Sequence, residues 1–374
     1  MIYKNFQNEF LSTLGLGAMR LPTLADGTID EAASAAMVAV AMEGGINYYD
    51  TAWGYHNGQS EPMMGKLLSA YPRESFKLAS KFPGYDLANM EKVEEIFEKQ
   101  LERCRVDYFD FYLFHNVCEL NVDGYLDPKY GIYDYLMAQK KAGRIRHLGF
   151  STHGTLETMR RFLEAYGKDM EFCQIQLNYL DWTFQEAKEK IDLLNRYHIP
   201  VWVMEPLRGG KLANVGGDHG KALAELRPEE SQVALAFRFL QAVPEVVVTL
   251  SGMSNMQQLK ENLETYETEK PLNGSEFQRV LEIASDMLKN VIPCTSCRYC
   301  TEYCPQGLDI PRLIKLYNEH AFTGGGFIAP MALRSVPQEK QPNACLGCGA
   351  CEAVCPQNIK ISKAMADFAA RIGS

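Results

Sequence analysis

The sequence has no long apolar run, no run of like charges and no low-complexity tract. Without about 18 consecutive apolar residues, it predicts no transmembrane helix and no membrane partner. The N-terminal stretch "MIYKNFQNEFLSTLGLG" lacks the basic region and following apolar region of a signal peptide, so we expect a cytoplasmic protein. No G-x-G-x-x-G leads from a β-rich run into a helical one, which disfavours a Rossmann domain.

The charge balance argues against nucleic acid as a partner. The 374 residues include 38 Lys and Arg against 47 Asp and Glu, which gives a formal net charge of −9. A protein that bound nucleic acid or an anionic surface would carry a cationic excess. With 46% hydrophobic and 23% charged residues, the composition is that of a globular chain, long enough for one large domain and a small module.

Cysteine is unevenly distributed along the chain. Eight of the eleven Cys lie in two runs, "CTSCRYCTEYCP" at 294–305 and "CLGCGACEAVCP" at 345–356. Each run spaces its Cys by three, three and four positions and ends in Pro, which fits the bacterial ferredoxin pattern for [4Fe-4S] clusters. The remaining Cys104, Cys118 and Cys173 stand in apolar surroundings and are expected in the core.

In the ferredoxin pattern, the Cys before the Pro binds the cluster that the other run holds. Two [4Fe-4S] clusters are therefore expected, one on Cys294, Cys297, Cys300 and Cys355, the other on Cys345, Cys348, Cys351 and Cys304. Zinc and disulfides are the competing interpretations, but zinc sites commonly use four ligands in all and lack the two Cys-Pro endings. Thiolate ligation also needs a reducing compartment, in agreement with a cytoplasmic location.

Upstream of the first Cys run, short β-rich runs alternate with helical stretches. The helical stretches place apolar residues at helical spacing, and several end at Gly. Eight strand–helix units over about 265 residues match an α/β fold with a closed (β/α)8 TIM barrel better than an open sheet. The predicted strands are 14–19, 46–50, 76–81, 110–115, 145–151, 172–177, 200–205 and 246–251.

The chain is predicted to contain two domains. Residues 264–278 contain Pro, Gly and charges and are interpreted as a linker. We therefore assign residues 1–270 to the barrel, and residues 271–374 to a helical linker followed by a small ferredoxin-like iron–sulfur domain. Within this second domain, "TGGGFIAPM" at 323–331 is expected to form a loop.

Polar residues stand at the predicted C-terminal ends of the strands, where TIM barrels carry their chemistry. They are Asp50, with Tyr55 five residues on, Lys81, His115, Ser151, Gln174 and Glu205. Taken singly, each has another explanation. An Asp after a strand is often a helix cap, a Tyr in a loop often packs, and a single His is more often structural than catalytic.

In combination, these segments resemble the aldo-keto reductases over residues 10–265. "NYYDTAWGYHNGQSEPMMGKLL" is similar to that family's D-T-A-x-x-Y-x-x-G-x-S-E segment, "ASKF" supplies its lysine and "DFYLFH" its histidine. "AGRIRHLGFSTH" and "QLKENL" match further family segments. The resemblance implies a catalytic tetrad of Asp50, Tyr55, Lys81 and His115, which acts on a carbonyl or alcohol substrate with NAD(H) or NADP(H).

The residue types of the tetrad suit carbonyl reduction, which adds hydride to carbon and a proton to oxygen. Tyr is a weak acid, with an ordinary pKa of about 10. We expect Lys81 to lower the pKa of Tyr55, and Asp50 to hold Lys81 charged and in place. A neutral His115 would donate a hydrogen bond to the carbonyl oxygen.

The resemblance also implies a set of nucleotide contacts. Ser151 and Gln174 would hold the nicotinamide carboxamide, and Met204 stands where the family has an aromatic residue against the nicotinamide ring. The full expected set is Ser151, Gln174, Met204, Glu205, Leu207, Gly252, Ser254, Gln258, Glu261 and Asn262, the last two near the adenine. Because the loop "SGMSNMQQ" has no cation for a 2′-phosphate, we expect NADH to bind at least as well as NADPH.

Three functions are consistent with a barrel joined to an iron–sulfur domain. The first is an oxidoreductase whose clusters exchange electrons with a ferredoxin-like carrier, docked on a basic patch near Arg298, Arg312 and Lys315. The second is an electron-transfer or docking protein with a scaffold barrel, and the third is an ordinary carbonyl reductase with structural clusters. The complete tetrad favours the first function over the scaffold barrel. One cluster would be enough to anchor the tail, so the presence of two favours the first function over structural clusters.

Electron exchange between nicotinamide and a cluster raises a chemical difficulty. Nicotinamide transfers two electrons together as hydride, whereas a [4Fe-4S] cluster passes one electron at a time. A relay between them would need a flavin or a similar group that splits the electron pair, and the sequence has no flavin signature.

Overall fold

The structure, a computed structural model, describes residues 1–294 and 297–373. It divides into two compact units, Met1–Ile283 and Ala284–Ser374. Among the described residues, no helix has the length and apolar character that a membrane span requires.

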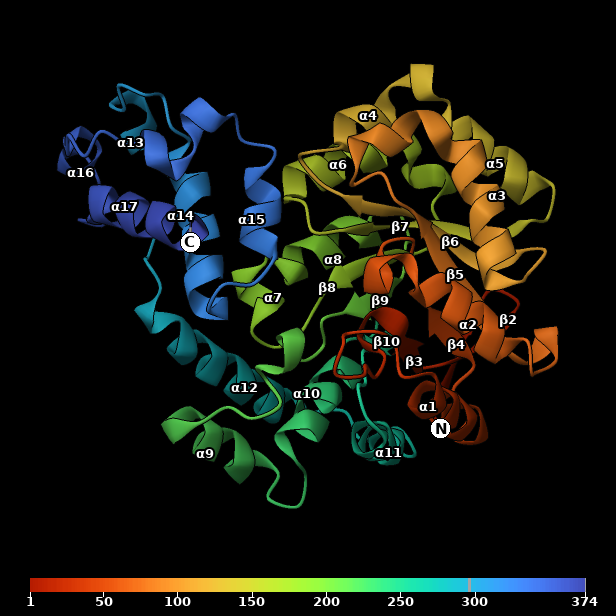
Figure 1. Ribbon diagram of the computed structural model, residues 1–374. Helices are drawn as coiled ribbons and strands as arrows, with labels where there is room; N and C mark the ends of the chain where they lie inside the picture. The colour runs from red at the N-terminus through yellow and green to blue at the C-terminus, as the bar shows by residue number, and fades with distance from the viewer. Residues whose placement is uncertain (295–296, 374) are drawn as a thin grey trace. The chain divides into compact units, whose positions relative to one another are not determined.

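Eight parallel strands close into a barrel in the first unit (Figure 1). The strands follow the chain order around the barrel, and the last pairs with the first to close it. The predicted (β/α)8 fold is confirmed, and each strand begins and ends within two residues of its predicted range. The strands are β3 (Leu14–Gly17), β4 (Tyr48–Asp50), β5 (Lys77–Phe82), β6 (Phe109–Val117), β7 (Ile145–Thr152), β8 (Cys173–Gln176), β9 (Val201–Met204) and β10 (Val246–Ser251).

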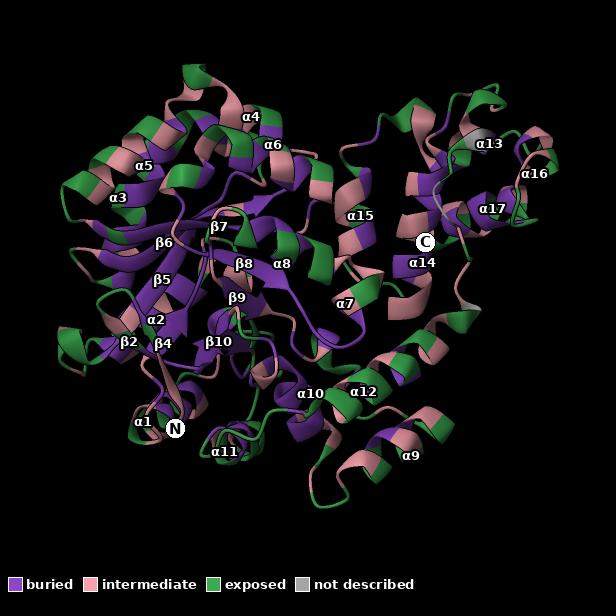
Figure 2. Cartoon of the chain, turned by 180° about the vertical axis from the view of Figure 1, so that it is seen from behind, coloured by how far each residue is buried: buried purple, intermediate pink, exposed green. Residues whose placement is uncertain are grey.

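Helices cover the outside of the barrel, and the strands inside them are almost entirely buried (Figure 2). Strands that are buried on both faces read as near-continuous apolar runs, which is why the β-rich segments were detectable in the sequence. The helices of this unit are α1 (Glu31–Glu43), α2 (Ser60–Leu68), α3 (Val93–Cys104), α4 (Val122–Leu126), α5 (Ile132–Lys141), α6 (Leu156–Tyr166), α7 (Asp181–Phe184), α8 (Ala187–Asn195), α9 (Gly217–Leu226), α10 (Gln232–Gln241), α11 (Met256–Thr265) and α12 (Gly274–Met287).

An N-terminal hairpin, which the sequence analysis did not predict, packs into the barrel interior. Its strands β1 (Tyr3–Phe6) and β2 (Glu9–Ser12) pair antiparallel. Phe6 is buried, with its ring centroid 5.0 Å from that of Trp202. The turn has Gln7 at φ 52 and contains no Gly, so the usual sequence signal of a tight hairpin turn is missing. The hairpin fills the N-terminal end of the barrel. The candidate active site lies at the opposite end, at the C-terminal ends of the barrel strands.

The second unit is built from short helices around a small apolar core. The core combines buried Cys300 and Cys351 with side chains of α14 and α17, such as Ile314 and Phe368. The helices of this unit are α13 (Tyr299–Glu302), α14 (Ile310–Thr323), α15 (Ile328–Leu333), α16 (Ala350–Ala353) and α17 (Ile361–Ile372).

The loop predicted at residues 323–331 is correct only in its first part. Gly324 ends α14 in the left-handed conformation at φ 62, as a C-terminal Gly often does. α15 then begins at Ile328, because Pro330 falls in the first turn of that helix, where a missing N–H is tolerated.

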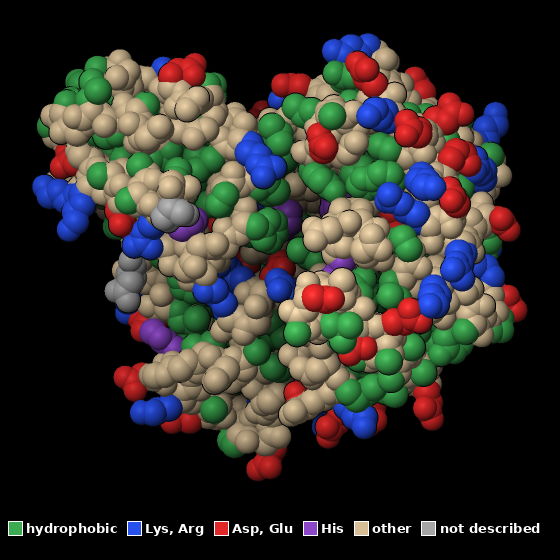
Figure 3. All heavy atoms as spheres, viewed as in Figure 1, with side chains coloured by type: hydrophobic (Ala, Val, Ile, Leu, Met, Phe, Trp, Pro, Cys, Tyr) green, Lys and Arg blue, Asp and Glu red, His purple; other side chains and the backbone are tan. Residues whose placement is uncertain are grey.

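Charge and cysteine are placed as the composition suggested. Over the barrel in Figure 3, basic and acidic side chains are interspersed. Cys104, Cys118 and Cys173 are all buried in the first unit, as expected for core residues.

Candidate active site

A buried ion pair joins the ends of two neighbouring strands. Lys81 near the end of β5 places Nζ 2.6 Å from Oδ1 of Asp50, the last residue of β4. Lys81 Nζ also donates a hydrogen bond to the Thr51 carbonyl oxygen at 2.8 Å. Both charged side chains are buried, with 0% and 3% of their surface exposed. The parallel pairing of β4 with β5 therefore brings together two residues that lie 31 positions apart in the sequence.

Tyr55 and His115 complete the cluster. Tyr55 begins the 3-10 turn η2 (Tyr55–Gly58), and its ring centroid lies 5.1 Å from Lys81 Nζ and 6.1 Å from the His115 ring. The His115 imidazole also packs edge-on against Tyr85, at 5.0 Å between ring centroids. His115 Nδ1 is buried and has no hydrogen-bond partner among the described residues. The structure thus brings all four predicted tetrad residues together.

Burial dominates the electrostatics of this cluster. Burial lowers the pKa of Lys81, while the charge of Asp50 and its hydrogen bond act in the opposite direction and favour the ammonium. Burial lowers the pKa of His115 well below its ordinary range, and the charge of Lys81 adds to the effect. His115 is therefore neutral at physiological pH, as expected.

The pKa of Tyr55 differs from the sequence-based expectation. Burial raises it well above the ordinary value, and the negative charges of Asp50 and Glu205 add to the effect. Lys81 does not lower it overall, because the ammonium is already engaged by Asp50 and the Thr51 carbonyl. Tyr55 therefore keeps its proton at neutral pH, as a group that donates a proton must.

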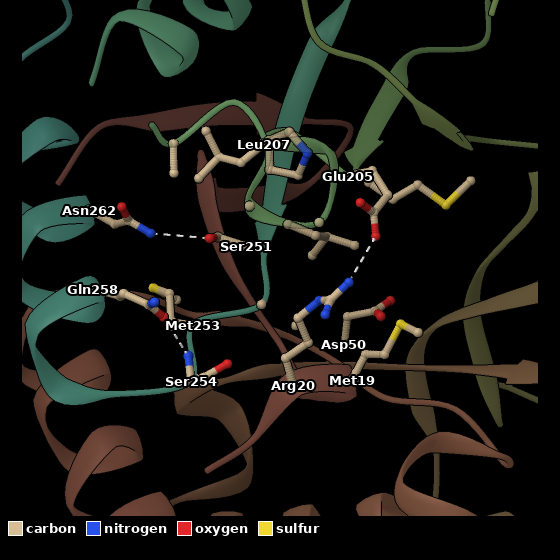
Figure 4. A pocket seen from close by; sticks show the side chains of 18 of the residues that line it. Met19, Arg20, Asp50, Glu205, Leu207, Ser251, Met253, Ser254, Gln258 and Asn262 are labelled. Carbon is tan, nitrogen blue, oxygen red and sulfur yellow. Dashed lines mark hydrogen bonds and ion pairs between the residues drawn. The ribbon is translucent and has the colours of Figure 1, made fainter. Parts of the chain in front are cut away.

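A cleft opens next to Asp50 and Tyr55 (Figure 4). Nine of the ten predicted nucleotide contacts line it, namely Gln174, Met204, Glu205, Leu207, Gly252, Ser254, Gln258, Glu261 and Asn262. Ser151 is not among them; it is buried, and its Oγ accepts a hydrogen bond from the Asn116 N–H at 2.8 Å. The cleft connects the tetrad with the start of α11.

Two acceptor atoms on this cleft have no hydrogen-bond partner among the described residues. They are the buried Oε1 of Gln174 and the buried Oδ2 of Asp50. An unpaired buried polar atom is unfavourable unless a ligand or water satisfies it. The cleft therefore suits a ligand that presents N–H or O–H donors next to Tyr55, and a nicotinamide carboxamide with its ribose is such a ligand.

The far end of the cleft is ordered by its own hydrogen bonds (Figure 4). Asn255 caps α11 by accepting a hydrogen bond from the Gln258 N–H at 3.0 Å, and the Ser254 N–H donates to Gln258 Oε1 at 2.8 Å. Asn262 Nδ2 donates to Ser251 Oγ at 3.1 Å. These bonds fix the loop in place without a bound ligand.

Arg20 is a cleft residue that the sequence analysis missed. It ends the short turn η1 (Ala18–Arg20) directly after β3, and its Nη2 lies 3.7 Å from Glu205 Oε1 (Figure 4). Among the described residues that line the cleft, it is the only Lys or Arg. The sequence analysis considered a cation for the nucleotide phosphate only in the loop after β10, which is far from Arg20 in the sequence. The closure of β10 on β3 places Arg20 at this cleft. Its position after the first barrel strand was the available signal.

Two pockets of the second unit are each lined by four cysteines. One is lined by Cys294, Cys297, Cys300 and Cys355. The other is lined by Cys304, Cys345, Cys348 and Cys351. Each set combines three Cys of one run with the Cys before Pro of the other, which is the grouping that the ferredoxin pattern predicts.

The pockets suit clusters better than single ions. Each thiolate of a [4Fe-4S] cluster binds a separate iron, so the sulfurs surround a space. Burial raises the pKa of Cys300 and of Cys351 to about 11, with neighbouring cysteines adding to the effect. Such thiols ligate as thiolates only when a strong positive charge is present, which iron supplies.

Two residues of the predicted basic docking patch have partners within the second unit. Arg298 Nη2 lies 3.2 Å from Asp309 Oδ1. Arg312 Nη2 donates a hydrogen bond to Ser335 Oγ at 2.5 Å. Docking of an electron carrier at this patch stays a prediction.

Comparison with known proteins assigns both units. The sequence model described as "Aldo/keto reductase family" matches residues 13–285. The chain belongs to the aldo/keto reductase family. A second model, described as "4Fe-4S dicluster domain", matches residues 293–359. The protein is therefore an oxidoreductase with an aldo/keto reductase barrel and a C-terminal ferredoxin-like iron–sulfur domain, as the sequence analysis predicted.

Individual relatives cover mainly the barrel. The uncharacterized oxidoreductase YqkF of Bacillus subtilis is 25% identical over 285 residues, which are 68% of this chain and 87% of that protein. The NADH-specific methylglyoxal reductase of Escherichia coli is 27% identical over 222 residues, 54% of this chain and 65% of its own. The holo form of aldo-keto reductase AKR11C1 from Bacillus halodurans superposes with a TM-score of 0.62 and 25% identity, over 76% of this chain and 96% of its own.

A substitution at the ion pair tests how far the site depends on it. Lys81→Met leaves the buried Asp50 carboxylate unpaired, and we expect the free energy of unfolding to fall by about 3–5 kcal/mol. The control is Lys188→Met, which removes an ion pair with Asp192 whose side chains are about half exposed. Urea denaturation should show a loss below about 1 kcal/mol for the control. Equal losses in the two variants would show that the Lys81 pair is not a special constraint.

Proposed function

We propose that the barrel interconverts a carbonyl and an alcohol at Tyr55 with NAD(P)H as the two-electron partner, and that two [4Fe-4S] clusters form a second route by which an external carrier supplies or takes up the two electrons in place of the nucleotide. The observation that carries the proposal is the buried Lys81–Asp50 pair beside a protonated Tyr55, at the edge of a cleft with unpaired acceptors. The E. coli relative named as a methylglyoxal reductase supports a small carbonyl compound as substrate.

Each tetrad residue has a role that its environment supports. In reduction, hydride reaches the carbonyl carbon and the Tyr55 hydroxyl gives its proton to the carbonyl oxygen. The phenolate that forms is stabilised by the nearby Lys81 ammonium, whose Nζ lies 5.1 Å from the ring. The neutral His115 is a hydrogen-bond donor for the carbonyl oxygen, and in alcohol oxidation the same steps run in reverse.

The cleft residues would hold a nicotinamide dinucleotide. Gln174 and Asp50 offer acceptors to the carboxamide and the ribose. The hydrogen-bonded loop at the start of α11, with Ser254, Gln258 and Asn262, would contact the adenosine half. Arg20 is the available cation for the diphosphate. The expectation that NADH binds at least as well as NADPH stays a prediction.

Electron exchange needs a step that the hydride reaction does not supply. Reduction through the clusters would deliver two single electrons to the carbonyl, together with two protons, and a reduced ferredoxin-like carrier would be the electron donor. A flavin at the barrel mouth or a quinonoid substrate would accept electrons singly and pass them on in pairs. The relatives that match the barrel support the hydride reaction, and the dicluster domain supports the electron path.

A carbonyl reductase with structural clusters is the second candidate. It is favoured by the burial of Cys300 and Cys351 in the core of the second unit. Loss of the metal from such a core would remove much of its stability, whatever the clusters do in turnover. The two candidates differ in whether the clusters change redox state during the reaction.

The first prediction concerns the phenol. Tyr55→Phe should lower kcat for reduction of methylglyoxal or another small carbonyl by about 10²–10⁴-fold, because the hydroxyl acts in the transition state. The nucleotide Kd, measured by fluorescence titration, should stay the same. Because the pKa of Tyr55 is raised, the phenol is protonated below that pKa, so the wild-type reduction rate should not fall between about pH 6 and about pH 9. Tyr130→Phe, in a distant surface turn, is the control, and an equal kcat in Tyr55→Phe would remove the proposed role.

The second prediction concerns the ligand sets. Under strict anaerobic conditions the wild-type protein should hold about eight irons, and Cys304→Ser about four, since one cluster is lost. Adding Cys345→Ser should remove no further iron, because Cys304 and Cys345 belong to one cluster. Adding Cys294→Ser instead should remove the rest. About four irons in the wild-type protein, or zinc in their place, would contradict the assignment.

The third prediction concerns the electron path. After the clusters are reduced with dithionite and the excess is removed, mixing with an oxidised carbonyl substrate should reoxidise them at the rate of turnover. Cluster absorbance and electron paramagnetic resonance report the redox state. Clusters that stay reduced while turnover with NADH proceeds would assign them a structural role and favour the second candidate.

A further inference from the structure

A cation from a neighbouring helix lies against the loop that carries Tyr55. Arg103, near the end of α3, places its guanidinium carbon 3.8 Å from the centre of the Trp53 ring. Trp53 is two residues before Tyr55, within the short segment that joins Asp50 to the phenol. A guanidinium stacked on an indole is attracted by the ring electrons and is restrained in orientation. The stack therefore restrains the loop.

Arg103 is itself held by a buried carboxylate. Glu61, in the first turn of α2, is fully buried, and its Oε2 lies 3.3 Å from Arg103 Nη1. Its Oε1 accepts hydrogen bonds from Ser80 Oγ at 2.7 Å and from Gln100 Nε2 at 2.5 Å. A buried carboxylate needs such partners, and Arg103 is the nearby cation that compensates its charge.

The same carboxylate is tied to the strand that carries Lys81. Gln100, whose Nε2 bonds to Glu61, also donates to the Lys81 carbonyl oxygen at 3.0 Å. The Gln100 Oε1 accepts a hydrogen bond from the Tyr112 hydroxyl at 2.5 Å. Glu61 thus connects, through Arg103 and Trp53, to the Tyr55 loop and, through Gln100, to the Lys81 backbone.

Close approach of two helices makes this arrangement possible. A Cβ added at Gly65 of α2 would lie only 2.4 Å from the Arg103 carbonyl oxygen, so only Gly allows α2 and α3 to meet there. Ser60, next to Glu61, adds a second tie to the loop, with its Oγ 2.8 Å from Thr51 Oγ1. The segment that resembles the family motif begins with Asp50-Thr51-Ala52 and ends with Ser60-Glu61. The contacts of Ser60 and Glu61 therefore hold the loop that starts at Asp50.

We propose that Arg103, fixed by Glu61 and stacked on Trp53, is a positioning residue that sets the distance and angle of the Tyr55 hydroxyl relative to Lys81 and His115. It is not among the described residues that line the cleft, and it acts through the loop. The inference depends on the proposed function, in which Tyr55 is the proton donor.

The test compares Arg103→Met with Arg160→Met, which removes an exposed ion pair with Glu157 on α6. Arg103→Met should lower kcat for carbonyl reduction by about tenfold to a hundredfold, since displacement of a reacting group by about 1 Å has effects of this size. KM for NADH should stay within a factor of about three, because the nucleotide cleft is not touched. Arg160→Met should match the wild type in both.

Two further measurements separate positioning from general damage. In a double-mutant cycle, the effects of Glu61→Gln and Arg103→Met on kcat should be non-additive, because both break the same connection. The fluorescence of Trp53 is obtained by subtracting the signal of the matched protein that also carries Trp53→Phe. Acrylamide quenching of this Trp53 fluorescence should rise in Arg103→Met and stay unchanged in Arg160→Met. If Arg103→Met does not fold, Arg103→Lys, which keeps the charge but loses the flat stack, takes its place.

The outcomes separate this inference from the proposed function. A wild-type protein that reduces no carbonyl defeats the proposed function, and with it the inference that Arg103 serves that reaction. If the wild-type protein turns over normally and Arg103→Met changes neither kcat nor the quenching of Trp53, the inference is overturned and the proposed function stands. A fall in kcat with additive effects in the cycle also overturns it. A fall in kcat with non-additive effects and increased quenching supports it.

Discussion

The salt bridge between Lys81 and Asp50 is the constraint on which the barrel site depends. Two opposite charges are stable in this interior only when they are paired and their remaining hydrogen-bonding groups are occupied. The Thr51 carbonyl takes one Lys81 proton, and β4 and β5 must pair in their observed register for the charges to meet. Tyr55 lies beside this pair, and the cleft opens next to Asp50.

The pair also explains why Tyr55 remains a phenol. A free ammonium beside Tyr55 would favour the phenolate, but Asp50 offsets the charge of Lys81, and burial then raises the pKa of Tyr55. The site thus keeps a protonated phenol with the Lys81 ammonium nearby. The buried Glu61 adds order to the same region, since its hydrogen bonds reach the Lys81 strand and its ion pair reaches the Tyr55 loop.

The two units solve different physical problems. The barrel buries a continuous apolar core. The second unit has a small core that includes two cysteines of the two cysteine-lined pockets, so cluster binding there would be linked to folding. An aldo/keto reductase barrel is thus joined to a 4Fe-4S dicluster domain, and how the two cooperate is the central functional question for this oxidoreductase.

The sequence alone determined those features whose signal is local. Buried parallel strands are apolar runs, cluster ligands follow a fixed spacing, and the tetrad positions stand at strand ends, so the fold and the sets of residues were predictable from short windows. The tertiary structure decided the rest. Arg20 enters the cleft only because β10 closes on β3. Arg103 reaches Trp53 only because Gly65 lets two helices touch. The direction of the Tyr55 pKa shift depends on burial and on the charges of Asp50 and Glu205, which lie at the ends of two different strands. Contacts between distant segments and the loss of water around a charge are properties of the closed barrel, and a short stretch of sequence does not contain them.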